Sequence, residues 1–146
     1  MSAQSARYDA LRAVMSGSAA FEATKEKTMT NSVLRTRSKD FAKSIVFLCR
    51  RMKQNNVEGV MINQLLRSGT SVGANIHEAQ YAQGRKDFIS KLEIALKECN
   101  ESEYWLELLH ETDSIDTDTF LAFQKNCIVL RRMLVASVTT LKEKEV

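Results

Sequence analysis

The chain of 146 residues contains no proline and only five glycines. Sheet proteins of this size depend on tight turns, and turns draw heavily on these two residue types. A chain that nearly lacks them has few places to reverse direction, so long helices must take up most of its length. The residue usage therefore favours an all-α fold with few loops. At this length we expect one domain with a single core.

Apolar residues recur at helical spacing in four segments. The clearest segment is 88–109, where intervals of four and three residues alternate as they do along the seam of a helix bundle. The four predicted seams are Leu34, Phe41, Ile45, Leu48 and Met52; Met61, Leu65, Val72, Ile76 and Ala79; Phe88, Leu92, Ala95, Cys99, Ser102, Leu106 and Leu109; and Phe120, Phe123, Cys127, Leu130, Leu134, Ser137 or Val138, and Leu141.

Polar segments separate the four seams. Residues 53–56 form a predicted loop after the first seam, and Gly84 is a predicted C-terminal cap of the second helix. Asp87 suits the start of the third helix, and residues 116–119 offer N-cap side chains for the fourth. Because long helices joined by short connections pack antiparallel to their neighbours, we expect an antiparallel up-and-down four-helix bundle.

The first 30 residues differ in composition from the rest of the chain. They are rich in Ala, Ser and Thr, so we interpret residues 1–30 as an N-terminal extension and residues 31–146 as the bundle domain. No apolar run approaches the roughly 18 to 20 residues that span a bilayer, and the N-terminus does not resemble a secretory signal. We therefore expect a cytoplasmic protein. Cys49, Cys99 and Cys127 have no metal or redox spacing, and we expect them to be reduced core residues.

Charge is strongly segregated, although the net charge of the whole chain is only +3. Residues 31–67 hold eight Lys or Arg against two acidic residues, a net charge of +6, whereas residues 87–118 hold ten Asp or Glu against two lysines, a net charge of −8. Part of this charge should pair inside the bundle or between subunits, and any basic remainder is a candidate anion-binding surface. The candidate nucleic-acid-binding residues are Arg35, Arg37, Lys39, Lys43, Arg50, Arg51 and Lys53.

A second candidate surface is polar and aromatic. Steps of four, four and three residues place one polar stripe on the second predicted helix, formed by Arg67, Ser71, Asn75 and Glu78. This stripe is either a solvated face or a partner for the acidic third helix, for example for Glu98 or Glu101, within the bundle or between subunits. Tyr104 and Trp105 lie off the third seam and either cap the core or contribute to a protein interface.

The chain carries no complete catalytic or metal-binding signature. Glu107 and His110 form one Glu-x-x-His step, whereas a carboxylate-bridged di-metal bundle uses two such steps and two further glutamates. His77 has no glutamate at the matching position. No serine or cysteine has an identifiable general base and orienting group. We therefore expect no catalytic activity, no metal site and no cofactor.

A resemblance to a known family is carried by two segments, LLRSGTSVGANIHEA at 65–79 and DFISKLEIALKECNESEYWLELL at 87–109. They resemble the bacterial four-helix bundle proteins first recognised as products of intervening sequences in 23S rRNA genes. The stretch NSVLRTRSKDFAKSIVFL fits the first helix of that family, and the spacing of Asn126, Cys127, Leu130 and Arg131 fits its last. The resemblance implies an antiparallel bundle, a ring-shaped homo-oligomer with a pentamer favoured, and no established enzymatic activity.

A more distant similarity connects this family with the accessory variability determinant of diversity-generating retroelements, a pentameric barrel that binds nucleic acid and a reverse transcriptase. Two functional hypotheses follow. In the first, the basic helix of a homo-oligomer binds RNA or DNA by charge and shape, because no base-reading motif accompanies it. In the second, the protein is a structural or adaptor protein that binds another protein through its acidic and aromatic face.

Overall fold

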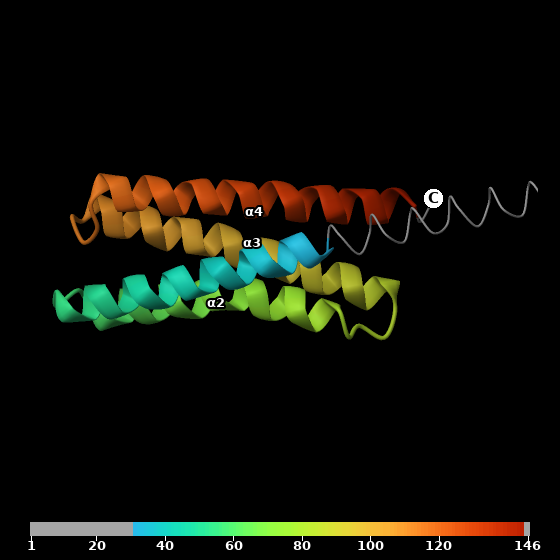
Figure 1. The fold of residues 1–146 in the computed structure, drawn as a ribbon, viewed down its shortest axis with the longest axis horizontal. Coiled ribbons are helices and arrows are strands. Elements are labelled where there is room, and N and C mark those ends of the chain that lie inside the picture. Colours follow the sequence, from blue (N-terminus) through green and yellow to red (C-terminus); the bar gives the residue numbers. More distant parts are fainter. Residues whose placement is uncertain (1–30, 145–146) are drawn as a thin grey trace, which may run out of the picture. The chain divides into compact units, whose positions relative to one another are not determined.

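The computed structural model describes residues 31–144, which are helical over most of their length. Within this part of the chain, a helix occupies residues 31–54, and it is followed by α2 (Gly59–Ala79), α3 (Arg85–Glu111) and α4 (Thr117–Glu143). Consecutive helices run antiparallel (Figure 1), so the predicted all-α four-helix bundle is confirmed. The N-terminal extension predicted for residues 1–30 lies outside the described residues.

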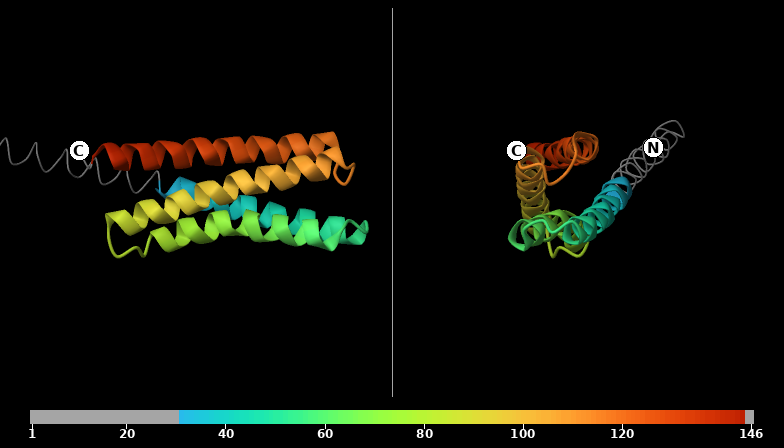
Figure 2. Two further views of the ribbon diagram at one scale, coloured as in Figure 1. Left: turned by 180° about the vertical axis from the view of Figure 1, so that it is seen from behind. Right: turned by 90° about the vertical axis from the view of Figure 1, so that its left-hand side faces the viewer.

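The four helices belong to one compact unit that begins at Leu34. In the end-on view of Figure 2, α3 lies between α2 and α4, and helix 31–54 lies beside α2. The ring of Phe41 contacts that of Phe123 on α4 edge-to-face, with 6.4 Å between the ring centroids. Helix 31–54 therefore packs against both α2 and α4. This arrangement places the basic helix and the acidic α3 on different parts of the bundle.

The helix ends confirm some predicted caps and correct others. Asp116 is the N-cap of α4, and its carboxylate accepts a hydrogen bond of 2.7 Å from the backbone N–H of Thr119. This hydrogen bond holds the pKa of Asp116 below its usual value. The prediction for Gly84 was wrong, because α2 already ends at Ala79 and Gly84 is the N-cap of α3. Its backbone is extended, with φ of −169°, as an N-cap requires.

The loop predicted after the first seam is shorter than expected. Helix 31–54 includes Lys53 and Gln54, and the chain reverses at Asn56, which has a φ of 58°. Asp113, in the turn between α3 and α4, has the same left-handed conformation. Asn and Asp tolerate this conformation better than other residues that carry a Cβ atom. Two short turns can therefore reverse the chain without glycine.

The core follows the predicted seams closely. Ser38 continues the first seam and is 1% exposed, and the third seam is buried from Leu92 to Leu109. The outer ends of two seams are displaced by one residue, because Ile62 and Ile89 are buried where Met61 and Phe88 were predicted. Met61 and Phe88 pack at the edge of the core instead. One residue corresponds to about 100° around a helix, so near the bundle ends the buried face is rotated around the helix axis relative to the prediction.

The three cysteines are free and buried, as predicted. The Cys49 Sγ atom lies 3.7 Å from the backbone carbonyl oxygen of Ile62 on α2. Burial raises the pKa of the Cys49 thiol to about 11, so this group stays protonated at neutral pH. A protonated buried thiol is a poor nucleophile and behaves as a small apolar residue.

Small residues on α2 allow two helices to approach closely. A Cβ atom at Gly69 would lie 2.8 Å from Cγ1 of Ile45, and one at Gly73 would lie 3.2 Å from the backbone oxygen of Ser38. On the other side of α2, the hydroxyl of Ser102 donates to that of Ser68 across 3.1 Å. The small residues around Gly69 thus let helix 31–54 pack closely against α2, and this contact determines which face of helix 31–54 is turned outward.

The position of the third seam can be tested by truncating neighbouring side chains. Leu92→Ala and Leu106→Ala should each lower the free energy of unfolding by about 2 to 5 kcal/mol, because both side chains are fully buried. Glu107→Ala should lower it by well under about 1 kcal/mol, because Glu107 is exposed. Urea unfolding measures all three values. Equal losses in the three variants would mean that α3 buries a different face.

Candidate nucleic-acid interface

The seven candidate cations all lie on the exposed surface of helix 31–54. Lys39, Lys43 and Arg50 lie within about 40° of one another around the helix axis and point away from the buried seam. Arg37 and Arg51 lie on the side of the helix that faces α4. Arg51 donates a hydrogen bond of 3.3 Å to the hydroxyl of Thr119. The predicted basic stripe is therefore exposed along the length of the helix.

These cations have few carboxylate partners. Among residues 31–144, the ion pair that involves one of the seven is Lys43 with Asp40, at 3.6 Å. The two side chains are 62% and 65% exposed, so water weakens this pair. Arg50 instead places its guanidinium carbon 5.8 Å from the centroid of the Phe47 ring. Most of the positive charge on this helix is therefore available to an external anion.

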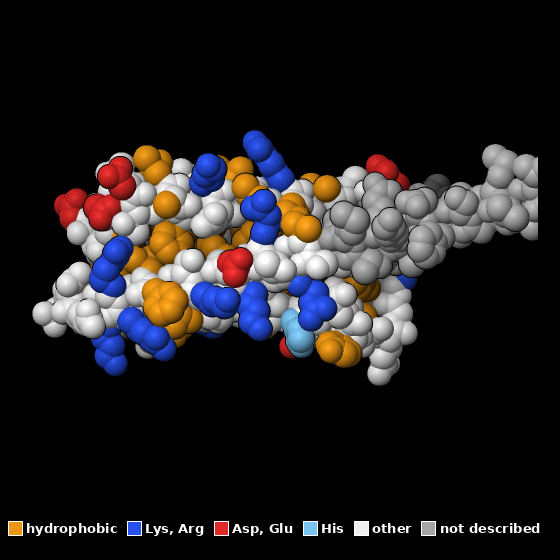
Figure 3. Space-filling model, in the orientation of Figure 1, with side chains coloured by type: hydrophobic (Ala, Val, Ile, Leu, Met, Phe, Trp, Pro, Cys, Tyr) orange, Lys and Arg blue, Asp and Glu red, His pale blue; other side chains and the backbone are white. Residues whose placement is uncertain are grey.

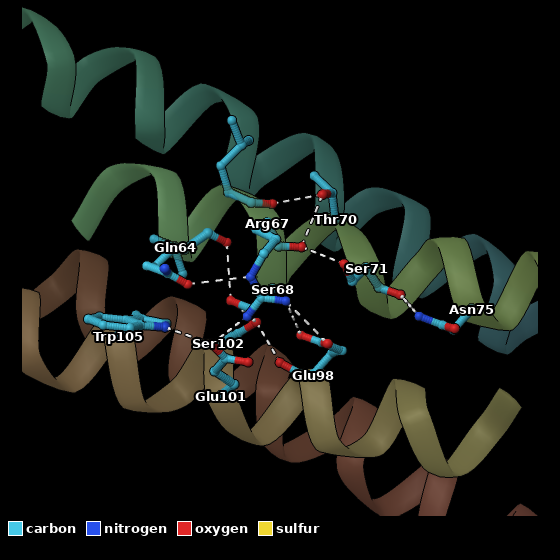
Figure 4. Close-up of polar contacts among 12 residues, drawn as sticks. Gln64, Arg67, Ser68, Thr70, Ser71, Asn75, Glu98, Glu101, Ser102 and Trp105 are labelled. Atoms are coloured by element: carbon cyan, nitrogen blue, oxygen red, sulfur yellow. Dashed lines mark hydrogen bonds and ion pairs between the residues drawn. The ribbon is translucent and has the colours of Figure 1, made fainter. Parts of the chain in front are cut away.

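The acidic α3 is neutralised on its α2 side. Arg67 extends from α2 across to α3, where its guanidinium pairs with Glu98 at 3.2 Å and also with Glu101 (Figure 4). The hydrogen bond from Arg67 is the main reason that the pKa of Glu101 lies below its usual value. Further along the same two helices, Lys91 of α3 pairs with Glu78 of α2 at 2.9 Å. These pairs lie within one chain.

The α4 side of α3 shows the same pattern. Arg131 pairs with Glu103, and Lys142 pairs with Glu93. The side chain of Glu103 is only 15% exposed, and its hydrogen bond with Arg131 raises the pKa of that guanidinium. Four carboxylates of α3 thus have a cationic partner on α2 or α4. The positive charge of those two helices is partly used inside the bundle, in contrast to that of helix 31–54.

The predicted polar stripe of α2 divides into two kinds of residue. Arg67 and Glu78 reach α3, as described above. Ser71 and Asn75 instead form hydrogen bonds within α2. The Ser71 hydroxyl donates to the backbone oxygen of Arg67 at 2.6 Å, and the Asn75 side-chain amide donates to the backbone oxygen of Ser71 at 2.8 Å. The structure therefore brings only the charged members of the stripe together with α3.

Tyr104 and Trp105 lie at the edge of the same network. Their rings meet edge-to-face with 5.0 Å between the centroids, and the Trp105 indole N–H donates to Glu101 at 3.2 Å. Trp105 packs against the core, whereas Tyr104 is 55% exposed. The sequence left open whether these two residues cap the core or contribute to a protein interface. Trp105 caps the core, whereas Tyr104 is exposed and available to a partner.

Three exposed residues on this side of the bundle were missed from the sequence. Phe47 is 64% exposed beside the predicted cations. Lys125 and Arg132, seven residues apart on α4, are also exposed. In Figure 3, Lys and Arg side chains are spread over this face of the molecule, whereas Asp and Glu gather mainly at the turn between α3 and α4. That α4 adds cations to this positive surface could have been expected from the net positive charge of its sequence.

A shallow groove runs between helix 31–54 and α4. Its volume is about 190 Å³; Phe41 and Leu130 contribute apolar surface, and Arg37, Asp40 and Asn126 contribute polar groups. No buried polar side-chain atom in the described part of the chain lacks a hydrogen-bond partner. The groove therefore offers a mixed apolar and polar surface beside the basic stripe, without an unsatisfied group aimed into it.

The residues that suggested metal or acid–base chemistry are separated. Glu107 is exposed, while the His110 ring stacks on Phe120 and its Nε2 lies 3.1 Å from the Thr117 hydroxyl. Over residues 31–144, no three His, Cys, Asp or Glu residues gather in a way that could hold a metal ion. The absence of metal and cofactor stays a prediction. In the same range, no helix is long and apolar enough to span a membrane.

Comparison with known families decides the family of this chain. Residues 30–136 match the family described as 23S rRNA-intervening sequence protein. The chain belongs to this family. The matched range covers the four helices of the bundle except the end of α4, so the family resemblance seen in the sequence is confirmed. The more distant link to the accessory variability determinant is not tested by these comparisons.

A solved structure supports both the family and the fold. It is the crystal structure of a protein of unknown function from the S23 ribosomal protein family of Bacteroides thetaiotaomicron. The two proteins are 44% identical, and the match covers 75% of this chain and 98% of the other, with a TM-score of 0.74. No match was found among curated proteins. These relatives establish the family and the bundle, and the function has to be inferred from the surface of this member.

Proposed function

We propose that this family member is a non-enzymatic homo-oligomer that binds RNA or DNA in the bacterial cytoplasm through the basic surface of helix 31–54. One observation carries the proposal: Arg67 of α2 and Arg131 and Lys142 of α4 pair with carboxylates of α3, while the seven cations of helix 31–54 are exposed and mostly lack such partners. Positive charge that has no partner inside the protein attracts an external polyanion.

The spacing of the basic residues suits a phosphate backbone. Lys39 and Arg50 are 11 helical steps apart, or about 16 Å of helix length, and Lys43 lies between them on the same outward stripe. Each phosphate contact releases condensed counterions, and this release drives binding that is independent of sequence. A ring-shaped homo-oligomer would present one such basic stripe on each subunit. The distant similarity to a nucleic-acid-binding barrel supports the proposal through shared fold alone.

The surroundings of the nucleophilic and basic side chains favour a non-enzymatic function. The three cysteines are buried, and His110 is engaged by Phe120 and Thr117. His77 lies on the exposed face of α2, with its ring 5.5 Å from that of Tyr81. An acid–base or nucleophilic site would need two or three such groups within hydrogen-bond reach of one another. The surface therefore supports binding better than catalysis.

The alternative function is protein binding through the acidic and aromatic face of α3. The exposure of Tyr104 favours it, because exposed tyrosines are frequent at protein interfaces. Against it, the nearby carboxylates of Glu98 and Glu101 are already paired with Arg67, which leaves less free charge for a partner. Nucleic-acid binding is therefore the function that the charge distribution supports better.

We expect the protein to be a homo-oligomer in solution, with a pentamer favoured. The support comes from the family resemblance and from apolar side chains exposed on different helices, such as Val60, Leu121 and Val135. Light scattering should return a mass near five times 16.5 kDa at micromolar concentration. A mass of about 16.5 kDa would contradict the oligomer, and another multiple would correct the stoichiometry.

The binding surface can be tested by removing the three outward cations together. In the triple variant Lys39→Gln, Lys43→Gln and Arg50→Gln, affinity for RNA or duplex DNA should fall because these side chains no longer neutralise phosphates. The slope of log affinity against log salt should become less steep by about 0.7 to 0.9 for each phosphate that is no longer neutralised. Gel shifts at two salt concentrations measure both quantities.

The matched control removes three exposed lysines from outside helix 31–54, with the variant Lys86→Gln, Lys97→Gln and Lys144→Gln. Both triple variants change the net charge equally, so a decrease in affinity confined to the first locates the binding surface. Unchanged binding by the first variant, still folded by circular dichroism, would reject this surface. If the wild type bound no nucleic acid even at low salt, the proposed function would be wrong.

A further inference from the structure

Phe47 occupies an unusual position for an aromatic residue. It lies on the outward side of helix 31–54, is 64% exposed, and does not pack against the hydrophobic core. Single exposed apolar side chains are common on proteins and by themselves indicate nothing. The surroundings of this ring are more informative, because it lies among the cations that have few partners inside the bundle.

A cation lies on each side of the ring along the helix. Lys43 precedes Phe47 by four residues and Arg50 follows it by three, which corresponds to about 6 Å and about 4.5 Å of helix length. All three side chains project within about 60° of one another around the helix axis. The guanidinium of Arg50 is already 5.8 Å from the ring centroid. A positive group, an aromatic surface and a second positive group therefore follow one another within about 10 Å.

We propose that Phe47 stacks on an unpaired base and that Lys43 and Arg50 hold the neighbouring phosphates, so that helix 31–54 prefers single-stranded nucleic acid to a duplex. This inference rests on the proposed function and narrows its ligand. Proteins that bind single strands without sequence preference combine a positive track with aromatic rings, because every base presents a π-face. In a duplex the bases are stacked and paired, and a ring can reach a base face only by unstacking a base step, which costs free energy.

The charge of the surface distinguishes a single strand from an acidic protein partner. A strand supplies negative charge at every nucleotide and a flat aromatic group between successive phosphates. The helix offers the complementary order of cation, ring and cation, and the acidic residue near it, Asp40, is itself paired with Lys43. The match between this order on the helix and one phosphate–base–phosphate step of a single strand favours nucleic acid as the occupant.

The test compares two variants that each remove one exposed aromatic ring. Phe47→Leu should lower the affinity for a mixed-sequence single-stranded oligonucleotide by about fivefold to a hundredfold, the range expected for removing one base–aromatic stack. Its affinity for the duplex of the same sequence, and its salt slope, should not change, because no cation is removed. Tyr104→Leu, which removes a ring that is 55% exposed on the acidic α3, should bind both ligands as the wild type does.

A base-free ligand and a fluorescent reporter separate stacking from charge. Inorganic polyphosphate should bind wild type and Phe47→Leu equally, since it has no base to stack. In Phe47→Trp, the single strand should quench the fluorescence of the new indole and polyphosphate should not. The wild type, which contains one tryptophan, Trp105, gives the background signal.

The inference would be overturned by unchanged single-strand binding in Phe47→Leu, by an equal decrease in affinity for polyphosphate, or by a wild-type preference for duplex. The proposed function would stand in each of these cases, because the protein would still bind a polyanion. A lower oligomer mass in Phe47→Leu would also overturn the stacking inference, since the ring would then belong to an interface between subunits. If the wild type bound no nucleic acid at low salt, both proposals would fail.

Discussion

The acidic α3 lies between α2 and α4, and the carboxylates that it turns toward these helices need counter-charges there. Glu103 and Glu98 have side chains that are only 15% and 19% exposed. A carboxylate that is largely withdrawn from water is costly without a partner. Arg67 from α2 and Arg131 from α4 provide those partners. The placement of α3 thus commits particular cations of its two neighbours to the bundle, and the charge of helix 31–54 is left outside this network.

This division of charge connects packing with function. Close contact of Gly69 with Ile45 fixes which side of helix 31–54 is buried against α2, so its opposite side must face the solvent. The basic stripe lies on that opposite side. Individual exposed ion pairs contribute little to stability. The ion pairs of α3 are more important for the alignment of α3 with α2 and α4 than for stability. The same charges that match α3 to its neighbours therefore determine which surface remains positive.

The seams and the segregation of charge could be predicted from the sequence, because helical periodicity and net charge are local properties. Leu92 to Leu109 are buried as their spacing indicates, and Asp116 caps α4 as its position indicates. The displacement from Phe88 to Ile89 could not be predicted, because it depends on where α3 starts and on its neighbours. Phe47 lies outside the predicted first seam, but periodicity alone does not show whether an off-seam ring packs against a neighbouring helix or is exposed.

The central claim is that accessible positive charge is concentrated on helix 31–54, and lysine footprinting tests it most directly. The protein would be treated with an amine-reactive acylating reagent, with and without inorganic polyphosphate, and the rate at each lysine measured by mass spectrometry. The account predicts that polyphosphate slows modification of Lys39, Lys43 and Lys53 and leaves the exposed Lys86 and Lys97 of α3 unaffected. Equal protection on both helices, or protection confined to α3, would contradict it.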